Sequence, residues 1–92
     1  MASTEDWTKD PDAKLDWVFD WSSWLQAGET ITASEFIVSA GLTVESSTKT
    51  AISATVWLSG GSTGQVYQVT NRITTNQNRI DDRSIRIRVV NR

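Results

Sequence analysis

The strongest constraint on the fold is the alternation of apolar and polar residues over residues 64–90. Within it, Tyr67, Val69 and Ile73 fall on one face of an extended chain, and polar side chains fall on the other. Residues 84–89 read Ser-Ile-Arg-Ile-Arg-Val and repeat the pattern. A period of two is typical of a strand with one buried face, and the intervening Asn-Gln-Asn favours a tight turn. The stretch predicts a long β-hairpin on which the rest of the chain assembles.

Further strands are predicted upstream of this hairpin. The segments that alternate in the same way are residues 14–21, 30–38, 42–46 and 49–58. In the first, Trp17 and Trp21 lie on the apolar face. The second changes phase near residues 34–35, which predicts a β-bulge on an edge strand. In the last, Trp57 opposes the apolar face and is expected on the outside of a sheet. Together with the hairpin, these segments indicate six or seven strands.

The connection before the hairpin helps to set the fold class. Residues 59–64 read Ser-Gly-Gly-Ser-Thr-Gly, a flexible crossover. Short strands joined in this way predict an all-β chain folded as a single immunoglobulin-like antiparallel β-sandwich, with a small open barrel as the alternative. Tyr67 lies where the tyrosine corner of such sandwiches sends its hydroxyl back to the crossover loop. An ordinary half-buried tyrosine is the other interpretation.

Residues 22–28 interrupt the strands without a period of two. They predict one helical turn that ends at Gly28. Trp24 in this turn is expected to plug one end of the core. The predicted structural residues are therefore Tyr67, Trp17, Trp21 and Trp24.

The length of 92 residues fits one domain with a single core. Residues 10–92 are assigned to the sandwich, and residues 1–9, which are polar and aperiodic, to a flexible N-terminal arm. Trp7 in this arm either folds back or anchors a partner. The start has no basic segment followed by an apolar run, and no apolar run reaches roughly 18 residues, so we expect neither a signal peptide nor a membrane span.

Charge is distributed unevenly along the chain. Residues 1–20 carry six acidic residues against two lysines, and residues 72–92 carry six arginines against two aspartates. Either the first and last strands are neighbours whose charges offset one another, or the acidic face of one copy meets the basic face of another copy or of a partner. Arg83, Arg86 and Arg88 are the basic candidates for such an interaction. If Arg86 and Arg88 pair internally, we expect their partners among the aspartates of residues 14–21.

The amino-acid composition excludes most kinds of enzyme active site. The chain contains neither histidine nor cysteine, which excludes serine triads, cysteine nucleophiles and histidine-ligated zinc sites. Asp16 and Asp20 share a strand face but stand about 13 Å apart along it, too far for a glycosidase pair. Asp10, Asp12, Asp81 and Asp82 lack the spacing of a calcium loop. We therefore expect no enzymatic activity, no cofactor and no metal.

Two binding functions compete with a purely structural role. The arginines of the hairpin suggest nucleic-acid binding, but no aromatic residue stands among them and the chain is acidic, so the sequence argues against this function. The tryptophans Trp7 and Trp57 suggest a carbohydrate-binding module, because exposed tryptophans can stack on sugar rings.

Several short motifs follow one another along the chain: Lys9-Asp10-Pro11-Asp12, Leu15-Asp16, Asp20-Trp21, Trp24-Leu25, Gly41-Leu42-Thr43-Val44, Val56-Trp57-Leu58-Ser59-Gly60-Gly61, Tyr67, Thr70-Asn71-Arg72-Ile73-Thr74-Thr75 and Asp82-Arg83-Ser84. Their order resembles that of small virion proteins of tailed bacteriophages, in particular the phage fiber-tail adaptor proteins. The chain departs from the expected pattern in its longer, tryptophan-bearing start and its arginine-rich last strand. The resemblance implies a structural protein of the virion, built as a β-sandwich and used as a joint or a decoration in many copies.

These observations together predict a non-enzymatic virion protein, assembled in the host cytoplasm, that joins the tail to fibres or to neighbouring tail or neck proteins. A capsid cement or decoration protein is the alternative. The expected partners are other virion proteins, in a symmetric assembly of several copies. The residues expected at these contacts are Trp7, Trp57, Arg83, Arg86 and Arg88.

Overall fold

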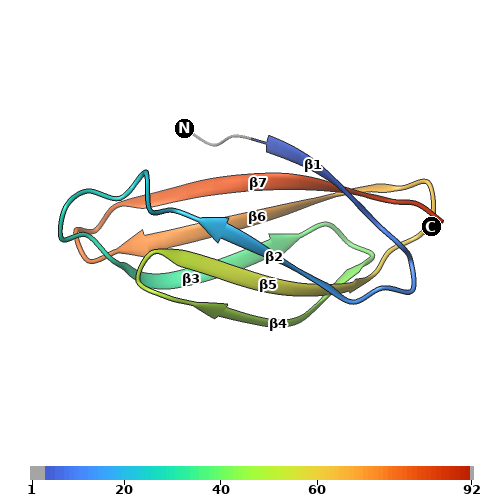
Figure 1. Cartoon of the computed structure of the whole chain (residues 1–92), viewed down its shortest axis with the longest axis horizontal. Coiled ribbons are helices and arrows are strands. Elements are labelled where there is room, and N and C mark those ends of the chain that lie inside the picture. Colours follow the sequence, from blue (N-terminus) through green and yellow to red (C-terminus); the bar gives the residue numbers. More distant parts are fainter. Residues whose placement is uncertain (1–3, 92) are drawn as a thin grey trace.

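The chain folds into two packed β-sheets, as the alternation predicts (Figure 1). The computed structural model describes residues 4–91, with side chains from residue 6 onward. Its strands are β1 (Thr4–Lys9), β2 (Leu15–Asp20), β3 (Ile31–Val38), β4 (Leu42–Lys49), β5 (Ser53–Gly60), β6 (Val66–Thr75) and β7 (Ile80–Val89). One sheet has the order β1-β7-β6-β3 and the other the order β2-β5-β4. The predicted β-sandwich is thereby confirmed.

The β6–β7 hairpin is the largest unit of the sandwich, and it matches its prediction closely. Both strands are ten residues long, and Asn78 in the turn adopts a positive φ of 62°. Tyr67, Val69 and Ile73 are buried along β6, as the alternation requires. On β7 the buried side chains are Ile85, Ile87 and Val89. The hairpin therefore supplies one wall of the core.

The opposite wall comes from β2 and β5. Trp17 and Phe19 of β2, and Trp21 just after it, are buried, and Val56 and Leu58 of β5 are fully buried. Trp57 lies on the outer face of its sheet with 39% of its surface exposed, as predicted. Burial of these large apolar side chains, each worth about 1.5 to 3 kcal/mol, is the main force that holds the sheets together.

The N-terminal segment differs from the expected arm. Residues 4–9 form β1, which pairs in parallel with β7 from Thr4↔Ser84 to Lys9↔Val89. Lys9 is fully buried and donates from Nζ to the carbonyls of Asp10 and Gly60, both at 2.8 Å. The free edge of β7 provides the hydrogen bonds that make this aperiodic segment a strand. Residues 1–3 of the predicted arm lie outside the described residues.

Three local predictions are corrected by the structure. The register shift of β3 lies between Ile31 and Ala33, before the predicted position at residues 34–35, although β3 is an edge strand as expected. Strand β4 continues to Lys49 beyond its apolar part, because β5 pairs with it along this length. Residues 22–28 form turns without a helix, and Gly28 has a φ of 75°.

The strand order can be compared with that of immunoglobulin domains. With the strands lettered A to G along the chain, the sheets are B-E-D and A-G-F-C. Constant-type immunoglobulin domains have A-B-E-D and C-F-G. The two arrangements share the order of the six later strands and differ in the sheet that the first strand joins. The immunoglobulin-like assignment itself stays a prediction.

The side chain of Tyr67 connects the start of β6 to the loop before it. Its hydroxyl accepts a hydrogen bond of 2.8 Å from the backbone N–H of Ser62, which is the contact predicted for a tyrosine corner. Glycines leave room for the ring: a Cβ on Gly41 would stand 2.8 Å from Tyr67 Cε2, and one on Gly61 would stand 3.3 Å from Cε1. Tyr67 therefore fixes the crossover between the two sheets.

We expect Tyr67→Phe to lower the free energy of unfolding by about 1 to 2 kcal/mol, because the substitution leaves the Ser62 N–H without its partner while keeping the ring. Urea denaturation followed by tryptophan fluorescence measures this change. Ser62→Ala keeps the backbone N–H and serves as the control, with a midpoint close to that of the wild type. An unchanged midpoint for Tyr67→Phe would show that the bond contributes nothing to stability.

Candidate interaction surfaces

The outer face of the four-stranded sheet carries the charges of both chain ends. Because β1 lies beside β7, Asp6 stands opposite Arg86 and accepts hydrogen bonds from its Nε and Nη2 at 2.9 and 3.3 Å. The partner of Arg86 is therefore Asp6, and the expectation of an aspartate in residues 14–21 is wrong. Arg88 lies on the same face, is exposed, and forms no ion pair with any described side chain.

The side chain of Arg83 makes contacts within its own chain. Its guanidinium carbon lies 4.2 Å from the centre of the Trp21 ring, and Nη1 donates to the carbonyl of Asp20. The cation therefore stacks on a core tryptophan and joins β7 to the end of β2. Of the three predicted basic contact residues, Arg88 alone has a guanidinium with no partner among the described residues.

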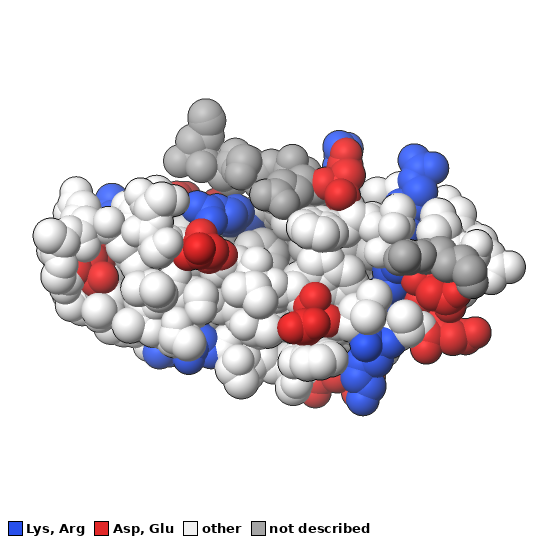
Figure 2. Space-filling view, in the orientation of Figure 1, with Lys and Arg blue, Asp and Glu red and all other residues white. Residues whose placement is uncertain are grey.

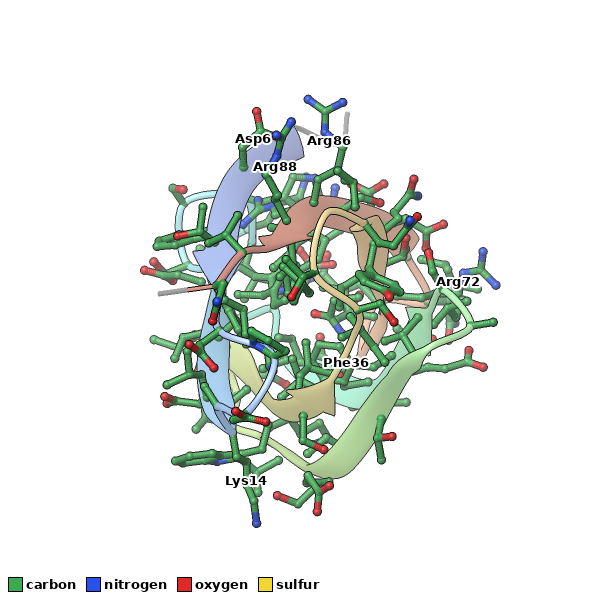
Figure 3. The ribbon with its side chains drawn as sticks, turned by 90° about the vertical axis from the view of Figure 1, so that its right-hand side faces the viewer. Asp6, Lys14, Phe36, Arg72, Arg86 and Arg88 are labelled. Carbon is green, nitrogen blue, oxygen red and sulfur yellow. The ribbon has the colours of Figure 1, made fainter. Side chains whose placement is uncertain are left out.

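The outer face of the three-stranded sheet has a different character. Trp57 projects from its central strand, with Asp16 and Ser46 as its cross-strand neighbours. Near it, Lys14 and Glu45 approach to 3.9 Å. The end-on view places Lys14 on the side of the molecule opposite to Arg86 and Arg88 (Figure 3). The predicted contact residues Trp57 and Arg88 thus lie on opposite outer faces.

A groove opens between β1 and β2, at one side of the sandwich. Its volume is about 530 Å³, and its apolar lining consists of Trp7, Leu15, Trp17, Val18, Phe19 and Ile85. Asp16, Asp20 and Arg83 stand among these residues. In the view of Figure 2, charged side chains of both signs form small separate groups around large uncharged areas. Trp7, the fifth predicted contact residue, belongs to this groove and is 46% exposed.

Buried polar side chains cross the core and position these surfaces. Trp21 Nε1 donates to Asn71 Oδ1 at 2.9 Å, and Asn71 Nδ2 donates to Ser34 Oγ at 2.9 Å and to the carbonyl of Glu35 at 3.1 Å. Asn71 is fully buried. Asn71 is not among the residues predicted to be structural, although it occupies an inward position of the β6 alternation. A polar residue at such a position requires a partner in the core.

The three tryptophans predicted to be structural lie in or against the core; they are Trp17, Trp21 and Trp24. Trp24 is only partly buried and meets Trp21 edge to face, with the ring centres 5.3 Å apart. The guanidinium carbon of Arg79 lies 4.0 Å from the centre of the Trp24 ring. Trp24 therefore lies at one end of the core, between Trp21 and the hairpin turn.

A buried carboxylate lies beside Trp24. Glu29 accepts hydrogen bonds from Arg79 Nε at 2.8 Å, from Thr75 Oγ1 at 2.6 Å and from the Gln26 N–H at 2.9 Å. The hydrogen bonds from Arg79 are the main reason that the pKa of Glu29 falls to about 2, against the opposing effect of burial. Sequence reasoning missed this cluster, because Glu29 and Arg79 are 50 residues apart. It ties the β2–β3 connection to the β6–β7 turn.

The Glu29 cluster predicts how stability depends on pH. The folded pKa of about 2 lies below the ordinary value of 4.5, so the carboxylate contributes stability that is complete above pH 4.5 and is lost as the pH falls toward 2. We expect the urea midpoint of the wild type to fall over this window. Glu29→Gln should lower the midpoint at pH 7 and show a smaller fall on acidification.

The exposed Glu35 of β3 provides a matched control, and Glu35→Gln should keep the wild-type pH dependence. The urea midpoint of Glu29→Gln should still decrease somewhat on acidification, because Arg72 lowers the pKa of Asp82 and the Ser22 N–H lowers the pKa of Asp20. An equal decrease of the urea midpoint on acidification in the wild type and in Glu29→Gln would contradict the role of Glu29 in the pH dependence of stability.

The described residues can be compared with the arrangements that metal sites and membrane spans require. Among them, no group of three or more aspartates and glutamates is placed to hold a metal ion. The part of the chain that the structure describes also has no helix of the length and apolarity needed to cross a membrane. The features that remain are surfaces for contact: two outer faces and one groove.

Comparison with protein families gives a match that spans most of the chain. A family model described as podophage GP4 fiber-tail adaptor protein gp77 matches residues 9–88. Among curated proteins, no match to the chain is found. The family match covers every strand from β2 to β6 and nearly all of β7, and therefore most of the core, whereas β1 lies outside it except for Lys9.

Proposed function

The chain belongs to the family of podophage GP4 fiber-tail adaptor proteins, and from this premise we propose that it is a non-enzymatic joint that links the tail to fibres or to neighbouring tail or neck proteins. A joint needs two separate contact surfaces on one rigid body. The observation that carries the proposal is the placement of Trp57 and Arg88 on opposite outer faces of the sandwich. Each face offers a different chemistry to a neighbour.

The two faces suit different partners. Trp57 offers a large aromatic surface, which is typical of the central anchor of a protein interface. Arg88 offers a cation that has no partner among the described side chains, beside the Asp6–Arg86 pair, which suits an acidic neighbour and speeds the encounter with it. In this proposal one neighbour packs on the β2-β5-β4 sheet, and the other packs on the β1-β7-β6-β3 sheet.

Rigid coupling between the faces supports the same role. The Trp21–Asn71 hydrogen bond joins the two sheets near one end of the sandwich, and the bond from Lys9 Nζ to the Gly60 carbonyl joins them near the other. Both bonds lie within the molecule, where an unmade hydrogen bond costs about 1 to 3 kcal/mol. Sliding one sheet past the other would break these hydrogen bonds and is therefore unfavourable. A neighbour bound on one face is thus held at a fixed distance and angle from a neighbour bound on the other.

The proposal extends to assembly and location. We place the protein in the virion, in several copies around a symmetric tail structure, after assembly in the host cytoplasm. The absence of cysteine fits assembly in a reducing compartment, because the fold requires no disulfide.

We expect Arg88→Glu and Trp57→Ala to act on different neighbours. Arg88 is exposed, so Arg88→Glu should change the free energy of unfolding by less than about 1 kcal/mol. Trp57, which is 39% exposed, also covers part of its sheet, so Trp57→Ala should lower the free energy of unfolding by about 1 to 2 kcal/mol and leave the sandwich folded. In particles assembled with each variant, one should lose attachment of the fibre-side neighbour and the other attachment of the tail-side neighbour. Quantitative protein analysis of purified particles measures both neighbours at once.

Two control variants introduce related but smaller changes away from the two faces. Gln77→Glu adds a negative charge in the hairpin turn, and Ile52→Ala removes an exposed apolar side chain between β4 and β5; both should assemble normally. The proposal fails if Arg88→Glu and Trp57→Ala leave both neighbours attached. Particles that carry hundreds of copies over the capsid would indicate a cement protein instead.

A further inference from the structure

The two sheets differ in width, and the difference leaves a strand position vacant. The four-stranded sheet extends to β1, whereas the facing sheet stops at β2. Trp7 is paired with Ile87, so its side chain points to the inner side of its sheet, as that of the fully buried Ile87 does. Trp7 is nevertheless 46% exposed, because no strand among the described residues faces it. The groove between β1 and β2 is this uncovered space.

The edge of β2 that borders the groove has backbone groups ready for pairing. The Trp21 N–H donates to the Ile52 carbonyl at 2.9 Å, which fixes the alternation of the β2–β5 ladder. In that alternation the N–H and C=O groups of Asp16, Val18 and Asp20 point away from β5. The Asp20 carbonyl accepts a hydrogen bond from Arg83 Nη1. The other N–H and C=O groups of Asp16, Val18 and Asp20 face the free edge. Such an edge is a template for an added strand.

The side chains along this edge define what such a strand must carry. Its inward side chains would meet the apolar lining of the groove, which includes Trp7, Leu15 and Phe19. Its outward side chains would lie beside Asp16, Val18 and Asp20 of β2. The Asp16 carboxylate is exposed and makes no ion pair with a described side chain. Opposite charges on adjacent strands stabilise a sheet, so the best occupant alternates apolar residues with lysine or arginine.

A second copy of this chain does not meet that requirement. The strands at the sheet edges are β1, β2, β3 and β4, and none of them carries a net positive charge. The arginine-rich strand is β7, which is paired with β6 on one side and with β1 on the other. A β2–β2 pair would bring aspartates of both copies onto the same face, where like charges destabilise.

We propose that the groove between β1 and β2 receives an extended, basic segment of a different protein, which adds to β2 as a fourth strand and covers Trp7. The adaptor function identifies this protein as another virion component, and to that extent the proposal rests on it. The strand addition itself follows from the edge, the groove and the charge, and it can be tested with the purified chain alone.

The probe is a seven-residue peptide, Ser-Ile-Arg-Ile-Arg-Val-Val, which has the sequence of residues 84–90 and the required alternation. Its extended length of about 23 Å spans β2. A peptide with glutamate at both arginine positions is the matched control. We expect saturable shifts of the Asp16 and Val18 amide signals and of the Trp7 indole signal in NMR titrations up to about 1 mM with the arginine peptide, and at least about tenfold weaker binding of the glutamate peptide.

Two variants separate strand addition from other binding. Val18→Pro removes an N–H that no strand of this chain uses, and proline is tolerated at such an edge position. We expect it to fold and to bind the arginine peptide at least about tenfold more weakly, whereas Val18→Thr, which keeps the N–H, should bind within about threefold of the wild type. Asp16→Lys should reverse the preference between the two peptides.

Each alternative has its own outcome. Equal binding of the two peptides, or wild-type binding by a folded Val18→Pro, overturns the proposal, and so does the absence of saturable binding. Self-association of the wild type that Val18→Pro abolishes would show that a second copy occupies the edge, which also overturns it. If Val18→Pro does not fold, the preference of Asp16→Lys decides. Because the titration uses no particles, its result is independent of whether the chain proves to be a joint or a cement protein.

Discussion

The parallel pairing of β1 with β7 determines most of what this molecule presents to its surroundings. It places Asp6 against Arg86 and thereby offsets part of the charge of the two chain ends. It also makes β7 an inner strand, which removes the most basic segment from the sheet edges. Because the first strand joins β7, no strand among the described residues lies alongside the free edge of β2. One pairing therefore explains the charge pattern, the exposure of Trp7 and the groove.

The interior is held by polar contacts as well as by apolar burial. Three hydrogen-bonded pairs join segments that are distant in the sequence. They are Trp21 with Asn71, Lys9 with the Gly60 carbonyl, and Glu29 with Arg79. No buried side-chain nitrogen or oxygen among the described residues lacks a hydrogen-bond partner. Apolar contacts alone permit neighbouring packings of similar energy, whereas a buried hydrogen bond is satisfied in one arrangement. These bonds give the sandwich a single geometry.

The sequence predicted those parts of the fold whose signal is local. Alternation identified the β6–β7 hairpin, the core tryptophans of β2 and the outward position of Trp57. It missed β1, because that strand has no periodicity and depends on the edge of β7, more than seventy positions away. It missed Asn71 and Glu29 for a related reason: their partners are 50 residues distant, and composition cannot indicate which polar side chains meet. The contact surfaces were predicted only as residue types, since their grouping onto two faces and a groove depends on the sheet order.

The direction of β1 has a mechanical consequence. Strands β1 and β7 run the same way, with Thr4 beside Ser84 in the middle of β7 and Lys9 beside Val89 at its end, so the chain enters the pair at Thr4 and leaves it at Val89 in the same direction (Figure 1). A pull between the two chain ends acts along both strands and loads their paired positions in shear. The hydrogen bonds then resist together, whereas a peeling force would open them one at a time. A protein anchored through both ends in a tail under tension would meet that load along its strongest direction.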